Sequence, residues 1–187
     1  DLYTFAQYQQ RVRLYAWRMM LAMRSEHPTI KLLLPWSYNI AYRYGLSLEK
    51  DIYGLLPSFV DGLLDEAPLG TVIYDGWESG YGYTQLHQFQ SAYTQMRRHN
   101  PAWHNVSQQQ YSARYRASFG LWVDAYGAWD THNIANNYFT PYKFERAIQS
   151  ALMTTDRYVW VYSQQVSWWD HSMPTDYVNA LWRGKYQ

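Results

Sequence analysis

Apolar residues recur along this chain in two alternating patterns. Over residues 4–26 they fall at helical spacing, and Thr4 with Gln7 has the spacing of a capping box, so we expect a helix to begin there. Pro28 ends that helix. The run at 30–34 is short and continuously apolar, which is typical of a buried parallel strand.

The same two patterns continue to the end of the chain. They predict helices at 52–66, 84–98 and 107–116, one that opens at 140–141 and one over 174–182, and strands at 71–74, 119–123 and 158–162. Strands that start roughly 40 residues apart and alternate with helices indicate a parallel sheet with right-handed crossovers. No G-x-G-x-x-G fingerprint follows a strand, which disfavours a nucleotide-binding Rossmann fold.

Four strands are half of the set that closes a (β/α)₈ barrel, which typically needs about 250 residues. The 187 residues suffice for one domain with a core. We therefore predict an α/β fold in which residues 1–187 form a single (β/α)₄ half-barrel, the C-terminal half of a TIM-type barrel. The other four strands would come from a missing N-terminal half, a partner chain or a second copy of this one. The chain begins at Asp1 without a visible signal peptide, so we expect a mature, processed or partial sequence.

Composition changes this picture mainly through the aromatic residues. They make up 19% of the chain, with 20 Tyr and 10 Trp but only 6 Phe. Tyr and Trp combine a flat apolar face with a polar edge, which suits sugar rings, although many of these rings could instead fill helix–sheet contacts or a protein interface. The net charge of +1 gives no field that would recruit nucleic acid or a membrane surface, and no apolar run approaches the roughly 20 residues of a membrane span.

Candidate chemistry gathers at the predicted strand ends, where β/α barrels carry their sites. The polar and aromatic residues there that we take as candidates are Trp36, Tyr38, Asn39, Asp75, Trp77, Glu78, Asp124, Tyr126, Tyr162, Trp168 and Trp169. Glycoside hydrolysis uses two carboxyl groups that flank the sugar. We expect Glu78 to be the nucleophile or base and Asp75 or Asp124 to be its partner, while the aromatic residues and Asn39 bind substrate.

Each of these residues also has a simpler interpretation. Asp75 could belong to a turn or cap the next helix, Asp124 could anchor a neighbouring loop, and Trp168 with Trp169 could plug the barrel mouth. The chain has no cysteine, and its histidines lack metal-ligand spacing, so we expect no metal and no cofactor.

Several stretches resemble a group of bacterial glycoside-hydrolase-like (β/α)₈ barrel proteins. The stretches are residues 5–8, 59–62, 74–78, 81–83, 137–145, 155–163 and 168–169. The resemblance covers nearly the whole chain and implies that it is the C-terminal half of such a barrel. It also implies that Asp75 and Glu78 match the group's acidic strand-end motif, while a further acidic motif lies on a strand that would precede residue 4.

Two functions follow as hypotheses. The first is a glycosidase that acts on an oligosaccharide or polysaccharide, in a secreted or periplasmic setting. The second is a non-catalytic carbohydrate-binding or structural barrel within a larger assembly. Two carboxylates roughly 5 to 9.5 Å apart across an open cleft would favour the enzyme. Carboxylates already engaged by protein groups, in a cleft filled by Trp and Tyr, would favour binding. Expected partners are carbohydrate and the remaining half of the barrel, with a homo-oligomer as one route to closure.

Overall fold

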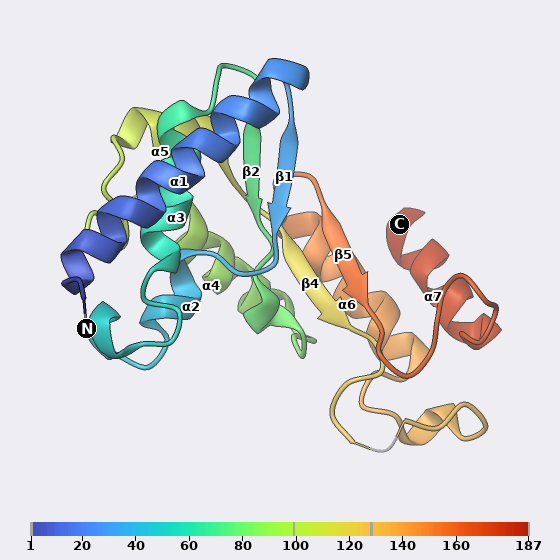
Figure 1. The fold of residues 1–187 in the computed structure, drawn as a ribbon. Helices are drawn as coiled ribbons and strands as arrows, with labels where there is room; N and C mark the ends of the chain where they lie inside the picture. The colour runs from blue at the N-terminus through green and yellow to red at the C-terminus, as the bar shows by residue number, and fades with distance from the viewer. Residues whose placement is uncertain (1, 99, 128, 187) are drawn as a thin grey trace. The chain divides into compact units, whose positions relative to one another are not determined.

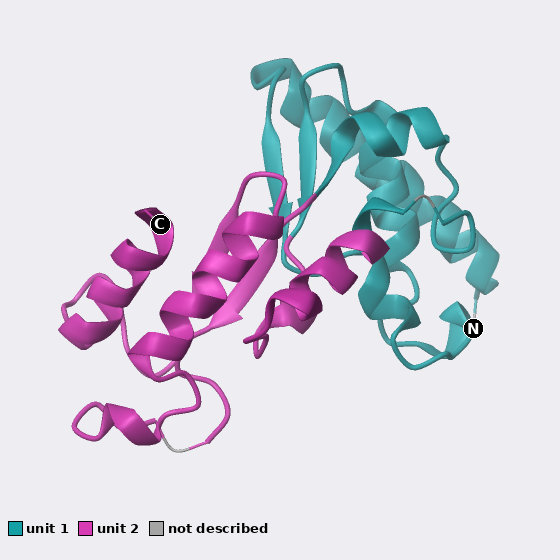
Figure 2. Cartoon of the chain, turned by 180° about the vertical axis from the view of Figure 1, so that it is seen from behind, with its two compact units in different colours: residues 1–75, 96–116 teal, residues 76–95, 117–187 magenta. Residues whose placement is uncertain are grey.

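The computed structural model describes residues 2–98, 100–127 and 129–186. Backbone contacts divide the chain into two compact units, coloured separately in Figure 2. Unit 1 holds residues 1–75 and 96–116, and unit 2 holds residues 76–95 and 117–187. The range that was predicted as a single domain, residues 1–187, thus contains two compact units.

Helices and parallel strands alternate along most of the chain (Figure 1). The elements, with η for 3₁₀ helices, are α1 (Phe5–Glu26), β1 (Lys31–Leu34), α2 (Tyr38–Tyr42), η1 (Leu48–Lys50), α3 (Leu56–Glu66), β2 (Val72–Asp75), η2 (Glu78–Gly80), α4 (Leu86–Arg97), α5 (Gln108–Arg114), β3 (Tyr115–Ala117), β4 (Phe119–Trp122), η3 (Ile134–Asn136), α6 (Pro141–Thr154), β5 (Val159–Tyr162) and α7 (Thr175–Tyr186). The predicted α/β class is therefore confirmed.

The strands form two small sheets. In the first, the order is β1-β2-β3, and β1 pairs with β2 in parallel so that Leu34 lies opposite Asp75. In the second, β4 pairs with β5 in parallel, with Trp122 opposite Tyr162. The described residues thus form five short strands where four were predicted. The additional strand is β3, which precedes the predicted third strand, β4, and is separated from it by Ser118.

Some element boundaries differ from the prediction. The helix expected over 107–116 ends at Arg114, and Tyr115–Ala117 is strand β3, because Tyr115 and Ala117 are buried on either side of the partly exposed Arg116. Pairing in the first sheet overrides the helical pattern there. The helix expected from residue 52 begins at Leu56, with Pro57 in its first turn.

Strand β1 is less buried than its apolar sequence predicts. Leu33 is 41% exposed, and the burial of β1 alternates between exposed and intermediate positions. The reason is its place at the edge of the three-stranded sheet, which leaves one side of the strand without a described neighbour.

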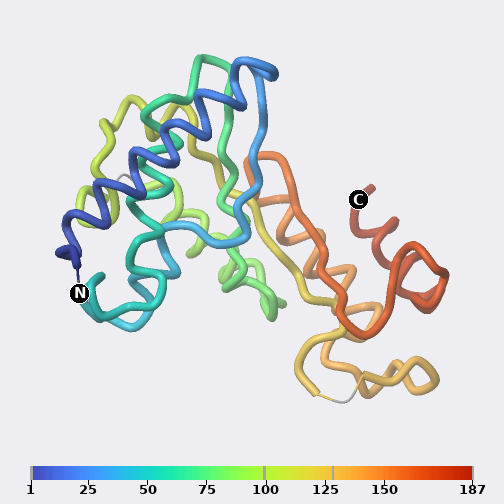
Figure 3. Tube along the Cα trace, viewed as in Figure 1, coloured from blue at the N-terminus to red at the C-terminus, as the bar shows by residue number. Residues whose placement is uncertain are grey.

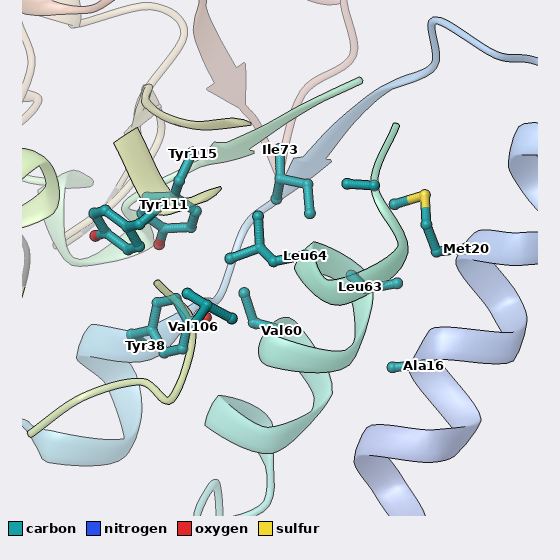
Figure 4. Packing of buried hydrophobic residues seen from close by; sticks show 11 residues of the cluster. Ala16, Met20, Tyr38, Val60, Leu63, Leu64, Ile73, Val106, Tyr111 and Tyr115 are labelled. Carbon is teal, nitrogen blue, oxygen red and sulfur yellow. The ribbon is translucent and has the colours of Figure 1, made fainter. Parts of the chain in front are cut away.

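The core of unit 1 lies between α1, α3 and the first sheet (Figure 4). The predicted capping box is confirmed, since Thr4 accepts from the Gln7 N–H and the Gln7 side chain accepts from the Thr4 N–H. Gly62 lets α3 approach α1 closely, because a Cβ atom at this position would lie 2.1 Å from the carbonyl oxygen of Arg13. Buried Met20 and Leu63 fill the space beside this contact.

The core of unit 2 is built from aromatic rings on α4, β4, α6 and α7. Phe89 of α4 meets Phe119 of β4 edge to face at 5.1 Å. Tyr177 of α7 is fully buried near Phe144, and its hydroxyl donates to the Phe139 carbonyl at 2.6 Å. The predicted cap at Thr140 is confirmed by its side chain, which accepts from the Lys143 N–H. The long connection from β4 to α6 carries η3 and can be followed in Figure 3.

Candidate functional site

The predicted site residues divide between the two units. Trp36, Tyr38, Asn39 and Asp75 belong to unit 1, and Trp77, Glu78, Asp124, Tyr126, Tyr162, Trp168 and Trp169 belong to unit 2. The two carboxylates expected to act together, Asp75 and Glu78, therefore lie on either side of the boundary.

Asp75 ends β2 and is 2% exposed. Its Oδ2 accepts a hydrogen bond of 2.6 Å from the hydroxyl of Tyr115 on β3. That hydroxyl also lies 2.5 Å from the hydroxyl of Ser37, which is fully buried. Burial and the charge of Asp75 raise the pKa of Tyr115, which keeps this phenol protonated as the donor. Asp75 is thus part of a buried polar chain in unit 1.

A second buried carboxylate in unit 1, Asp61 on α3, was not among the predicted residues. Tyr38, whose side chain is 1% exposed, donates to Asp61 Oδ1 at 2.7 Å, and the Asn105 N–H donates to Oδ2 at 3.0 Å. The guanidinium of Arg13 lies 3.7 Å away and also binds Asp65. Burial raises the pKa of Asp61, while the hydrogen bonds from Tyr38 and Asn105 oppose that rise. The signal in the sequence was an acidic residue between apolar Val60 and Gly62-Leu63.

The remaining unit 1 candidates differ in exposure. Tyr38 is buried in the core and donates its hydroxyl to Asp61, so its ring offers little surface to a substrate. Trp36 is 41% exposed and packs edge to face on Tyr53 at 4.9 Å. Asn39 is partly buried at the start of α2.

Glu78 opens η2 in unit 2 and is partly buried. The backbone N–H of Tyr81 donates to the Glu78 carbonyl at 3.1 Å. Burial raises the pKa of Tyr81 strongly, and the nearby Glu78 carboxylate raises it further, so the phenol stays protonated at all ordinary pH values. Glu78 therefore lies beside a neutral phenol.

Tyr81 lies among three rings from the second sheet. The ring centroids of Trp122, Trp160 and Tyr162 lie 5.7, 5.4 and 5.9 Å from that of Tyr81. The backbone fixes this arrangement, because the Trp122 N–H donates to the Tyr81 carbonyl and the Trp160 indole donates to the Gly76 carbonyl. Gly120 provides the space, since a Cβ atom there would lie 2.6 Å from the Trp160 ring.

Two tyrosines extend this group beyond the strand ends. Tyr126 is 58% exposed in a left-handed conformation with φ of 55°, and its ring lies 6.1 Å from Trp122 and 5.0 Å from Tyr138. The hydroxyl of Tyr138 donates to the Gly82 carbonyl at 2.7 Å. We call the six rings of Tyr81, Trp122, Tyr126, Tyr138, Trp160 and Tyr162 the aromatic rim.

Asp124 follows β4 and is 1% exposed. Its carboxylate accepts from the Trp122 indole at 2.7 Å and from the backbone N–H groups of Gln164, Gln165 and Val166. These contacts are the ones expected if Asp124 anchors a neighbouring loop, because three of the four donors belong to the 164–166 segment. A catalytic role for Asp124 stays a prediction.

The other predicted tryptophans have different surroundings. Trp77 is 4% exposed with φ of 41°, and its indole donates to the Tyr83 hydroxyl at 3.3 Å. Trp168 stacks on Phe144 of the core at 6.4 Å. Trp169 is 90% exposed. Of the three, Trp169 presents the most surface to solvent.

Comparison of the chain with protein-family models, with curated proteins and with solved structures found no match. The site must therefore be interpreted from its own geometry. Within residues 2–98, 100–127 and 129–186, no group of three or more His, Cys, Asp or Glu side chains is placed to hold a metal ion. No helix in the same described ranges is both long and apolar enough to cross a membrane.

Four members of the aromatic rim were not among the site residues predicted from the sequence: Tyr81, Trp122, Tyr138 and Trp160. The strand residues Trp122 and Trp160 were assigned to the predicted strands, where a ring can face either side of the sheet. Tyr81 and Tyr138 lie in loops, and only the pairing of β4 with β5 and the hydrogen bond from Tyr138 to Gly82 bring them beside the strand ends.

Proposed function

We propose that unit 2 binds an oligosaccharide on the aromatic rim. The observation that carries this proposal is the packing of the Tyr81 ring among rings from both strands of the second sheet. Tyr126 is 58% exposed and Tyr162 is 38% exposed, so two rings of this group are accessible.

The chemistry of the rim suits sugars. Tyr and Trp faces pack against the C–H faces of a pyranose, and their polar edges hydrogen-bond to its hydroxyl groups. The Glu78 carboxylate can accept hydrogen bonds from sugar hydroxyls, because a carboxylate has about four acceptor positions.

Calorimetric titration of the full chain tests this proposal. The probes are neutral tetrasaccharides of glucose, xylose, mannose and galactose, together with tetragalacturonate. For a probe that binds, Tyr126→Ala and Tyr162→Ala should each weaken affinity about tenfold, as expected for loss of an aromatic anchor.

The matched control is Trp182→Ala, which removes a 51% exposed ring that stacks on Tyr186 of α7, outside the rim. This variant should bind as the wild type does. A wild-type chain that binds none of the probes, or rim variants with unchanged affinity, would overturn the proposal.

Glycoside hydrolysis at the same rim is the second candidate function. It is favoured by Glu78, a partly buried carboxylate next to the neutral Tyr81 phenol of the aromatic rim. Glu78 would act as nucleophile or base, with the partner carboxyl from Asp124 or another half of the barrel. Asp124 already accepts protein hydrogen bonds, so we place this candidate after binding.

Turnover by the complete assembly distinguishes the two candidates. If the site is catalytic, Glu78→Gln abolishes release of reducing ends while affinity and thermal stability change little. Retention of turnover in this variant would exclude the catalytic role of Glu78, and absence of turnover in the wild-type assembly would leave binding as the function.

The proposed architecture is the C-terminal half of a (β/α)₈ barrel. Two features support it. Strand β4 follows β3 after a single residue. Strands β1 and β2 pair in parallel, as do β4 and β5, and the two strands of each pair were predicted as neighbours in the barrel. The exposed edge of β1, with Leu33 41% exposed, would pair with a strand from the other half. Light scattering on the chain tests closure by a second copy, which a soluble monomer would exclude.

A further inference from the structure

A cavity of about 540 Å³ opens in unit 2 between the start of α4 and one face of α6. The lining residues that matter here are Thr84, Gln85, Tyr138, Tyr142, Lys143 and Arg146. Its volume lies in the range of roughly 300 to 1,000 Å³ that small-ligand sites occupy. None of the candidate site residues predicted from the sequence lines it.

The cavity is positively charged. Lys143 and Arg146 are three residues apart on α6, so they lie on the same face of that helix. In the described part of the chain neither forms an ion pair, and no described lining residue is acidic. The neighbouring Glu145 binds Arg183 of α7 at 2.7 Å and does not neutralise them.

Arg146 keeps donors for a ligand. Its Nη1 donates to Gln149 Oε1 at 2.8 Å, and a guanidinium has five N–H donors in all. The N-terminus of α4, at Leu86, also lines the cavity, and its helix dipole adds positive potential there. Two side-chain cations and one positive helix end thus face the same space.

Tyr138 connects the cavity to the aromatic rim. Its side chain lines the cavity, its ring lies 5.0 Å from that of Tyr126, and its hydroxyl is fixed on the Gly82 carbonyl. A chain of sugars lying across Tyr126 would therefore reach the cavity by passing Tyr138.

We propose that this cavity binds the acidic group of a saccharide, a carboxylate of a uronic acid or a sulfate ester, whose neighbouring rings lie on the aromatic rim. This inference rests on the proposed function and narrows its ligand class to acidic oligosaccharides. Lys143 and Arg146 would select for an acidic group through charge-assisted hydrogen bonds, and the rings of the rim would stack on the neighbouring sugars whatever their identity.

Calorimetric titration of the full chain with four probes tests this inference. The probes are tetragalacturonate, the same tetramer with its carboxyls methyl-esterified, a sulfated galactan tetrasaccharide and neutral galactotetraose. The wild type should bind at least one acidic probe about tenfold more tightly than its neutral counterpart, and added salt should reduce that difference. The uronate and the sulfate probes distinguish the two acidic groups.

The double variant Lys143→Gln with Arg146→Gln should lose about tenfold in affinity for the preferred acidic probe, as expected for two partly solvated ion pairs. Its affinity for the neutral probes should not change. The control variant Lys31→Gln with Arg157→Gln removes the same charge from β1 and from the segment before β5, at positions that do not line the cavity, and should keep the wild-type preference.

The outcomes separate this inference from the proposed function. If neutral and acidic probes bind equally, or if the cavity variant keeps its preference, the inference fails while saccharide binding on the rim stands. If no probe binds, both fail together. If the control variant loses the preference as well, the effect belongs to net charge and the cavity has no specific role.

Discussion

The hydroxyl of Tyr115 donates a 2.6 Å hydrogen bond to Asp75, and both side chains are buried in unit 1. Asp75 is one of the strand-end carboxylates predicted to be catalytic, and this contact gives it a partner on β3. The same hydroxyl meets Ser37, so three segments of the first sheet region share one polar chain. The consequences of this chain can be measured.

Tyr115→Phe should lower the free energy of unfolding by about 1–3 kcal/mol, because it removes the donor to the buried Asp75 carboxylate and the acceptor of the Ser37 hydroxyl. Urea unfolding measures the change. Tyr8→Phe is the matched control, since Tyr8 is 41% exposed on α1 and should change stability by less than about 0.5 kcal/mol. Equal effects of the two substitutions would show that the Tyr115 contact adds nothing.

Asp61 predicts a pH dependence of stability. Burial raises its pKa above the ordinary value of 3.8. Between the unfolded and the raised folded pKa, the folded state binds more protons than the unfolded state, so the free energy of unfolding falls as pH rises through that range. The contribution of Asp61 is fully present below 3.8 and is lost above the raised pKa.

Urea unfolding of the wild type and of Asp61→Asn from about pH 4 to pH 7 checks this sign. The wild-type value minus the variant value should decrease as pH rises, because only the wild type titrates at this position. Asp130 and Asp170 act in a different window, below 3.8, since hydrogen bonds to each carboxylate lower its pKa. A difference that is constant or grows with pH would contradict the expected environment of Asp61.

Asp124 should behave as a loop anchor. Asp124→Ala leaves the N–H groups of Gln164, Gln165 and Val166 without their buried acceptor, so we expect a loss of about 3 kcal/mol in the free energy of unfolding. In hydrogen-exchange measurements, the amides of Gln164 and Gln165 should exchange faster in this variant than in the wild type.

The control for this variant is Asp130→Ala, which removes a carboxylate that accepts from two turn N–H groups, those of His132 and Asn133, at the surface. The expected loss is smaller, because water replaces the lost acceptor. If Asp124→Ala were as mild as this control, the anchoring role would be rejected.

Gly120 should be essential for the arrangement of the aromatic rim. Gly120→Ala places a Cβ atom 2.6 Å from the Trp160 ring and 2.9 Å from the Tyr81 ring, so we expect a loss of about 1–3 kcal/mol and a changed near-ultraviolet circular dichroism spectrum. The second substitution Trp160→Leu makes room for the methyl group. In a double-mutant cycle the two changes should cost less together than their sum, and simple additivity would show that Gly120 and Trp160 do not interact.

The α/β class and most elements of this chain could be predicted from the sequence, because both depend on local signals. The apolar period, the capping box at Thr4 and Gln7 and the Thr140-Pro141 pair act over a few residues and placed the helices. Four of the predicted strands were found within one residue at each end. Tyr115 and Arg116 of strand β3 were assigned to a helix, because the pairing partner β2 is distant in sequence.

Which polar residues are buried and which rings meet depends on contacts between segments that are distant in the sequence. A strand-end position brings Asp75, Asp124 or Trp77 to the right region, but the sequence cannot say that Tyr115, the 164–166 segment or Tyr83 will occupy their polar atoms. Side chains at one strand end can point into the core or to solvent, and that direction depends on the register of the sheet and on neighbouring loops. The aromatic rim and the cationic cavity beside it arise from such long-range contacts.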